Sequence, residues 1–109
     1  MPSPRPGRPV RGSASGRPIM ALLDLLGRRW ALRVVWELRG GPLTFRALQE
    51  QGGVSPTVLN ARLADLRAAG IVEQRAGEGY ALSAAGAQLL AALEPLQDWA
   101  ARWAKRGGR

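Results

Sequence analysis

The segment that most constrains the fold spans residues 43–70, LTFRALQEQGGVSPTVLNARLADLRAAG, which is typical of two short helices joined by a tight turn. Thr44 is suited to cap the first helix, because its side-chain oxygen can accept a hydrogen bond from a first-turn amide. Gly52 and Gly53 supply the backbone freedom that a tight turn requires. Ser55, followed by proline, gives the second helix a defined start. The segment therefore predicts a helix-turn-helix.

The second predicted helix, residues 55–69, has one apolar face. Leu59, Leu63 and Leu66 recur at spacings of four and three, as the packed face of a helix requires. A helical hairpin in any small all-α domain needs the same features, so this pattern alone does not decide for nucleic-acid binding. The positions off the leucine face are Thr57, Val58, Asn60, Ala61, Ala64, Asp65, Arg67 and Ala68.

A β-hairpin is predicted directly after this helix, over residues 71–83. Two β-prone runs, 71–75 and 80–83, flank a glycine-rich turn. Helix, turn, helix and hairpin is the order of a winged helix, so the expected fold is mainly α with a small β-hairpin. Arg75 lies at the turn, where it could contact the phosphate backbone. The alternative is a solvated charge at the end of a strand.

Three stretches of the chain carry a family signal: RPIMALLDLLGRRWALRVVWELRGGPLTFRALQE, VSPTVLNARLADLRAAGIVEQR and YALSAAGAQLL. From residue 17 onward they resemble the HxlR-type winged helix-turn-helix transcriptional regulators of bacteria. The resemblance implies a homodimer that binds operator DNA and represses or activates nearby genes. In the first stretch, the matching positions are Pro18, Leu23, Asp24, Gly27, Trp30, Glu37, Leu38, Gly41, Pro42, Phe45 and Leu48.

The chain departs from the family pattern at two places. Many members have a cysteine immediately before the proline that opens the first helix, and some use it to sense oxidants or electrophiles. This chain has Arg17 there and no cysteine, so thiol-based sensing is excluded. The wing turn is also shorter than in many relatives, so we expect a short reach along DNA.

Composition favours one small domain and argues against an enzyme. A chain of 109 residues with 46% hydrophobic content can bury a single core, and a domain of this size is expected to be only marginally stable unless an oligomer buries further surface. The absence of Cys and His removes thiol nucleophiles, the usual zinc ligands and the imidazole acid or base. We therefore expect no catalysis, metal or cofactor. Neither a membrane span nor a secretory signal is recognisable, which favours a cytoplasmic protein.

The net charge of +8 comes entirely from the two ends of the chain. Residues 1–18 and 102–109 contain only basic charges, whereas the body between them is neutral. The first segment, rich in Arg, Pro and Gly, is expected to be a disordered tail, and residues 19–106 to form the winged-helix domain. The tail is interpreted either as a non-specific phosphate contact or as a solvated extension that reflects a GC-rich genome.

Two helices are predicted before the helix-turn-helix, over residues 19–26 and 29–39. In the second, Leu32 and Trp36 lie off the face that would form the core. Trp36 is expected to pack against a neighbouring helix; the alternative is a pocket for a small apolar effector, lined by Trp30 and Trp36. The expected core residues of this helix are Trp30, Ala31, Val34, Val35 and Leu38.

The last helix, after Ser83, has apolar residues over about half its circumference. Pro95 should kink or divide it near Glu94. We expect the surplus apolar face, together with that of helix 19–26, to pack against a second copy of the chain. The alternative is that the tryptophans fold back on their own domain. The expected dimer residues are Ile19, Leu22, Leu23, Leu93, Leu96, Trp99 and Trp103.

The sequence thus predicts a homodimeric, sequence-specific DNA-binding regulator, expected to be a repressor, that recognises an inverted-repeat operator. The recognition helix would enter the major groove, and the wing would lie on the DNA backbone. The alternative is a winged-helix module that contacts another protein and has no operator of its own. The expected DNA-binding residues are Thr44, Arg46, Ser55, Thr57, Val58, Asn60, Ala61, Arg62, Arg67 and Arg75.

Overall fold

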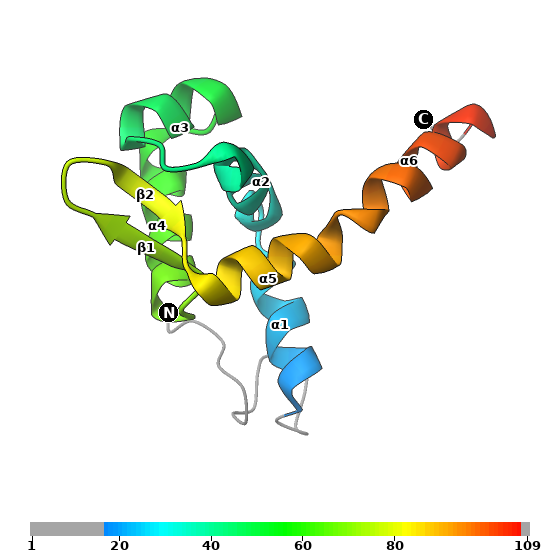
Figure 1. Cartoon of the computed structure of the whole chain (residues 1–109), viewed down its shortest axis with the longest axis horizontal. Helices are drawn as coiled ribbons and strands as arrows, with labels where there is room; N and C mark the ends of the chain where they lie inside the picture. The colour runs from blue at the N-terminus through cyan, green and yellow to red at the C-terminus, as the bar shows by residue number, and fades with distance from the viewer. Residues whose placement is uncertain (1–16, 108–109) are drawn as a thin grey trace.

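The computed structural model describes residues 17–107, which fold into helices and one two-stranded antiparallel sheet (Figure 1). This fold class is the predicted one. Residues 1–16 of the expected tail lie outside the described residues. None of the helices in the described part has the length and apolarity that a membrane crossing requires. The elements in order are α1 (Pro18–Leu26), α2 (Ala31–Glu37), the 3-10 turn η1 (Leu38–Gly40), α3 (Phe45–Gly52), α4 (Pro56–Ala68), β1 (Val72–Arg75), β2 (Gly79–Leu82), α5 (Ala84–Leu93) and α6 (Pro95–Lys105).

The core lies between α2, α3, α4 and the hairpin. The predicted leucine face of α4 is buried, since Leu59, Leu63 and Leu66 are at most 1% exposed. The predicted core face of α2 is buried as well, with Trp30 half-buried at its start. This helix begins later than expected because Trp30 has a φ of 76°, which lies outside the helical region, and its expected last turn is the 3-10 turn η1.

A short backbone pairing that the sequence did not indicate extends the hairpin. The Leu43 amide donates to the Tyr80 carbonyl at 2.9 Å, and the Tyr80 amide donates to the Leu43 carbonyl at 2.8 Å. Gly79, with a φ of 97°, allows this approach, because a Cβ there would collide with the Leu43 backbone. A pairing of single residues has no periodicity, so sequence patterns cannot reveal it. It attaches the hairpin to the segment that leads into α3.

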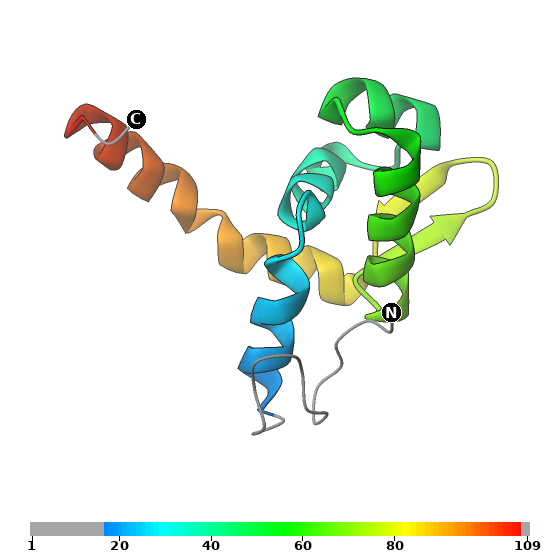
Figure 2. The ribbon, with the colours of Figure 1, turned by 180° about the vertical axis from the view of Figure 1, so that it is seen from behind.

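The predicted division of the last helix is confirmed: α5 ends at Leu93, and α6 begins at Pro95. The two helices meet at a bend, and α6 extends away from the rest of the chain, as both views show (Figures 1 and 2). No residue of α6 is buried. The alternative in which Trp99 and Trp103 fold back on their own domain is therefore not what the chain adopts. The two rings instead stack on each other, with centroids 5.6 Å apart.

Candidate nucleic-acid interface

The two helices of the predicted helix-turn-helix, α3 and α4, are capped as the sequence indicated. Thr44 Oγ1 accepts a hydrogen bond from the Ala47 amide at 3.1 Å, and Ser55 Oγ accepts one from the Val58 amide at 3.3 Å. Gly53, with a φ of 67°, forms the turn between them. Because both caps and the turn are local, the start of α4 is fixed by the sequence around it.

The outer face of α4 presents small and polar side chains to solvent. Thr57, Asn60 and Ala61 are exposed near its first turns, and Arg67 is exposed near its end. Within residues 17–107, the Asn60 side chain makes no hydrogen bond with protein, so its amide is available to a ligand. Val58, which the sequence also placed on this face, is half-buried and packs against the core.

Asp65 is the clearest departure from the predicted face assignment. It was expected on the polar side of α4, but only 8% of it is exposed. Its carboxylate lies 3.0 Å from Arg28 Nη1 and 2.6 Å from Arg62 Nη1. A carboxylate is tolerated at such a site because two guanidinium groups compensate its charge. The leucine spacing could not show this, because Arg28 comes from a distant part of the chain.

Arg62 is oriented toward the protein in this arrangement. Its Nε donates to the Arg29 carbonyl at 2.9 Å, and its Nη1 donates to Asp65. Only 22% of its side chain is exposed. The guanidinium of Arg62, which was expected to contact DNA, thus forms its hydrogen bonds within the domain.

The pKa of the Asp65 carboxyl follows from opposing influences. Burial, the largest of them, raises the pKa because it penalises the charged form. Hydrogen bonds from Arg28 and Arg62, and the positive charges of both, act in the opposite direction and together outweigh burial. The pKa therefore lies below its ordinary value of 3.8, so Asp65 is ionised at neutral pH.

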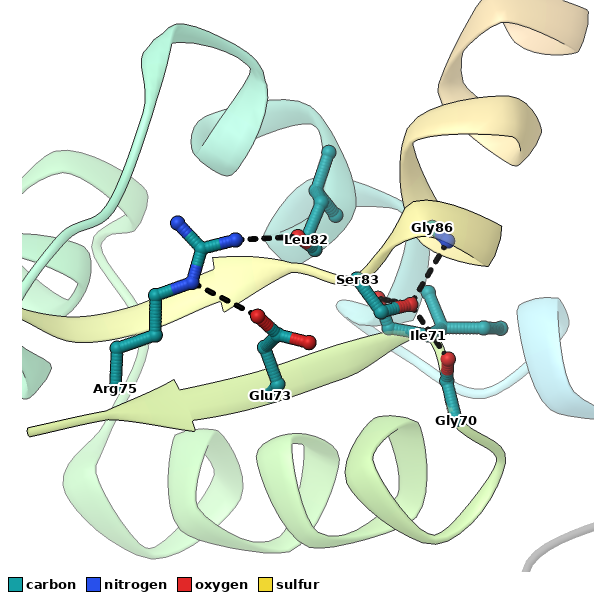
Figure 3. Close-up of polar contacts among 7 residues, drawn as sticks. All are labelled: Gly70, Ile71, Glu73, Arg75, Leu82, Ser83 and Gly86. Atoms are coloured by element: carbon teal, nitrogen blue, oxygen red, sulfur yellow. Dashed lines mark hydrogen bonds and ion pairs between the residues drawn. The ribbon is translucent and has the colours of Figure 1, made fainter.

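The wing is anchored to the end of α4 through Ser83 (Figure 3). Its hydroxyl donates to the Gly70 carbonyl at 2.6 Å and accepts from the Gly86 amide at 3.0 Å. The Ser83 amide donates to the Ile71 carbonyl at 3.0 Å. A Cβ at Gly86 would collide with that same carbonyl, so only glycine fits there. The sequence marked Ser83 as a helix start but not as the residue that joins α4, the wing and α5.

The arginine of the wing is paired with an acid of the same strand. Arg75 Nε donates to Glu73 Oε2 at 2.8 Å, and Arg75 Nη2 donates to the Leu82 carbonyl at 3.5 Å (Figure 3). With Glu78 in the turn, the hairpin carries two acids and one base. On α3, Arg46 likewise lies 3.7 Å from Glu50. Positive charge is therefore sparse on this side of the domain.

Apart from the polar face of α4, large apolar side chains are exposed on α1 and on α6. Five of these side chains are between 45% and 55% exposed, and the other two expected dimer residues, Leu22 and Leu93, are half-buried. The five are Ile19, Leu23, Leu96, Trp99 and Trp103.

The two tryptophans predicted to line one ligand pocket lie in two adjacent hollows. Trp36 lines a groove of about 410 Å³ between α2 and the helices α5 and α6, with Val35, Leu90 and Leu93 among its other walls. Trp30 lines a hollow of about 360 Å³ beside the turn that follows α1. In the described part of the chain, no cluster of acidic residues could hold a metal ion.

Comparison with known proteins agrees with this geometry. Residues 25–107 match the family model described as HxlR-like helix-turn-helix. Quinone-bound YodB from B. subtilis superposes with a TM-score of 0.70 at 30% identity, covering 77% of this chain and 94% of that one.

A possible HxlR family transcriptional factor from Thermoplasma volcanium gives a TM-score of 0.69 at 29% identity, covering 77% of this chain and 82% of that one. The transcriptional repressor BigR from Xylella fastidiosa gives 0.64 at 33% identity, with coverages of 72% and 81%. No functionally curated protein sequence matches the chain.

Proposed function

Because the chain belongs to the HxlR-like helix-turn-helix family, we propose that it is a transcriptional regulator that reads duplex DNA through the first half of α4. The observation that carries this proposal is the exposed group of Thr57, Asn60 and Ala61 at the start of a capped helix. Asn60 has its amide available and can pair bidentately with adenine in the major groove.

Polar residues of α3, α4 and the wing are assigned to the DNA backbone. Thr44, Arg46, Ser55, Arg67 and Arg75 would hold the domain in register by contacting phosphates, which carry no sequence information. Arg46 and Arg75 form ion pairs with Glu50 and Glu73. We therefore expect DNA affinity to depend only weakly on salt concentration through these contacts. Arg62 and Val58 were also expected to contact DNA. Because both contact other parts of the protein, we propose instead that they hold α4 in place.

The regulator is proposed to act as a homodimer. Its support is the exposed apolar surface of α1 and α6, which a monomer would leave in water. A two-fold dimer presents two copies of α4 on the same side of a duplex, so the operator is an inverted repeat with half-sites about one helical turn apart or a multiple of it. We infer repression, in a cytoplasmic protein, as the mode of regulation.

An effector, if used, is proposed to be small, apolar and bound without a covalent bond. The groove beside Trp36 is lined almost wholly by apolar side chains, and tryptophan can stack on an aromatic ring. YodB, a structural relative, is seen bound to a quinone. In this chain there is no cysteine for covalent capture.

The proposed base-reading role is tested with Asn60→Ala. An operator is first selected from random DNA with the wild-type protein. The variant should lose about 1 to 3 kcal/mol of binding free energy on that operator and retain its affinity for random DNA. Gln88→Ala, which removes an exposed amide from α5, is the matched control and should bind both DNAs as the wild type does.

Equal losses on both DNAs, or none, would remove Asn60 from base reading. Failure of the wild-type protein to select any sequence would instead favour the protein-contact module.

A further inference from the structure

The turn between α1 and α2 holds a backbone conformation that a bulky residue rarely adopts. Trp30, at the start of α2, has φ 76° and ψ −6°. It is the one non-glycine residue with positive φ among residues 17–107. Such a conformation is costly and persists only where the surrounding contacts enforce it. The contacts that hold this turn therefore need an explanation.

The Trp30 ring packs against the core, and three charged residues add polar contacts to the turn; we call Arg28, Arg62 and Asp65 the charged clamp. Arg28 belongs to the turn, whereas Arg62 and Asp65 lie on adjacent turns of the inner side of α4. Asp65 binds both arginines, and Arg62 also binds the carbonyl of Arg29, the residue directly before Trp30. The clamp thus joins the turn to α4 through one side-chain ion pair and one hydrogen bond to the backbone of the turn.

The clamp also reaches the end of α1. Arg28 Nη2 lies 3.7 Å from the Asp24 carboxylate, one helical turn earlier in the chain. All the carboxylate and guanidinium groups involved are at most 22% exposed. Water therefore competes weakly for them, and each guanidinium has a defined direction.

Such a cluster is a poor source of net stability, because desolvation offsets most of the attraction. Such a cluster does fix the relative orientation of the elements that it joins, because its hydrogen bonds are directional and allow few alternative arrangements. Here the elements joined are α1, whose exposed leucine and isoleucine belong to the proposed dimer surface, and α4, which is the proposed recognition helix.

We propose that the charged clamp positions α4 relative to α1, so that the placement of α1 in the dimer sets the spacing at which the two recognition helices meet DNA. This inference rests on the proposed function. Asp65, Arg28 and Arg62 are positioning residues: they touch neither bases nor phosphates, and they act through the orientation of α4.

The first measurement needs neither DNA nor a dimer. Asp65→Asn should speed amide hydrogen exchange in the turn at residues 27–31 and in the middle of α4 by about tenfold, within the range typical of a coupling between two sites. Glu37→Gln is the matched control. It also removes one carboxylate from a close ion pair, at 2.6 Å, but that pair lies within α2 alone.

The second measurement is DNA binding with the half-sites of the selected operator moved progressively apart. The wild type and Glu37→Gln should prefer one spacing, whereas Asp65→Asn should lose about tenfold of that preference and keep its affinity for a single half-site. Asp65→Glu, which retains the charge, should recover most of the preference for one spacing. A defect that arises merely from lower stability would weaken all spacings together.

Unchanged exchange and spacing preference in Asp65→Asn would overturn the inference, as would equal changes in Glu37→Gln. If Asp65→Asn does not fold, Arg28→Lys keeps the charge but loses the guanidinium geometry, and it should show the same two changes. If the wild type shows no preferred DNA, the proposed function fails, and the exchange experiment still decides whether the clamp couples the turn to α4.

Discussion

Helices α4 and α6 differ in what covers their apolar residues. Over the 13 residues of α4, three leucines are almost completely buried within the chain. Over the 11 residues of α6, none is buried, and the stacked Trp99 and Trp103 remain half exposed. Similar apolar spacing therefore predicts a face that packs, but not whether the same chain or another one supplies the partner surface.

The difference has an energetic consequence. Packing within one chain stabilises the fold equally at every protein concentration, whereas packing between chains stabilises it only as far as the copies associate. The expected effects below test this distinction in decreasing order of size.

The largest effect is expected for Leu63→Ala in α4. Removal of a side chain that is 1% exposed should lower the free energy of unfolding by about 2 to 5 kcal/mol, through lost burial and the cavity left behind. Urea titrations at two protein concentrations should give the same loss. The control is Leu96→Ala, the same truncation on α6, which should change the stability of the monomer by less than about 0.5 kcal/mol. Equal losses of unfolding free energy for both variants would contradict the proposed difference between α4 and α6.

The next effect is expected for Trp99→Ala in α6. Exposed tryptophans that become buried on association often act as anchors, so the dimer should weaken by about 2 kcal/mol or more while the monomer keeps its fold. Sedimentation equilibrium measures the change in the dissociation constant. Ala101→Ser, on the opposite side of the helix, should associate normally. A wild type that remains monomeric and still binds its operator tightly would contradict this view of α6.

An intermediate effect is expected for the acidic residues of the two helices. The pKa of Asp65 is lowered by folding, so its contribution is fully present above its ordinary value of 3.8 and is lost as pH falls through the lower folded value. Asp65→Asn should therefore cost about 1 to 3 kcal/mol near neutral pH, and this loss should shrink in acid. Denaturant titrations across pH measure the difference.

Asp98→Asn on α6 provides the control for that experiment. Asp98 is exposed in the first turn of α6, so the variant should stay within about 0.5 kcal/mol of the wild-type stability at each pH. A constant deficit of Asp65→Asn at every pH would exclude a contribution from ionisation.

The smallest effect is expected at the wing, where Arg75 is exposed and already paired with Glu73. Arg75→Ala should weaken binding to operator and random DNA alike, and reduce the slope of affinity against salt by at most about one unit. Glu73→Gln should act in the opposite direction, because it leaves Arg75 uncompensated. Loss of binding to the operator alone would show that the wing reads sequence.

Much of this architecture could be read from the sequence because its causes are local. Thr44 and Ser55 cap the amides of their own first turns, Pro95 interrupts its own helix, and the leucines of α4 follow the helical repeat. The hairpin was predicted to within one residue at each end, because its turn also depends on neighbouring glycines. The outward position of Asn60 follows from the same repeat.

The remaining features required the tertiary structure, because each depends on groups that are distant in sequence. Asp65 is buried because Arg28 reaches it from the turn after α1, and Arg62 is turned inward by the carbonyl of Arg29. Ser83 joins α4 to the wing only once the chain has folded back. The exposure of α6 is of the same kind: periodicity defines an apolar face, but which surface meets it depends on how distant elements pack.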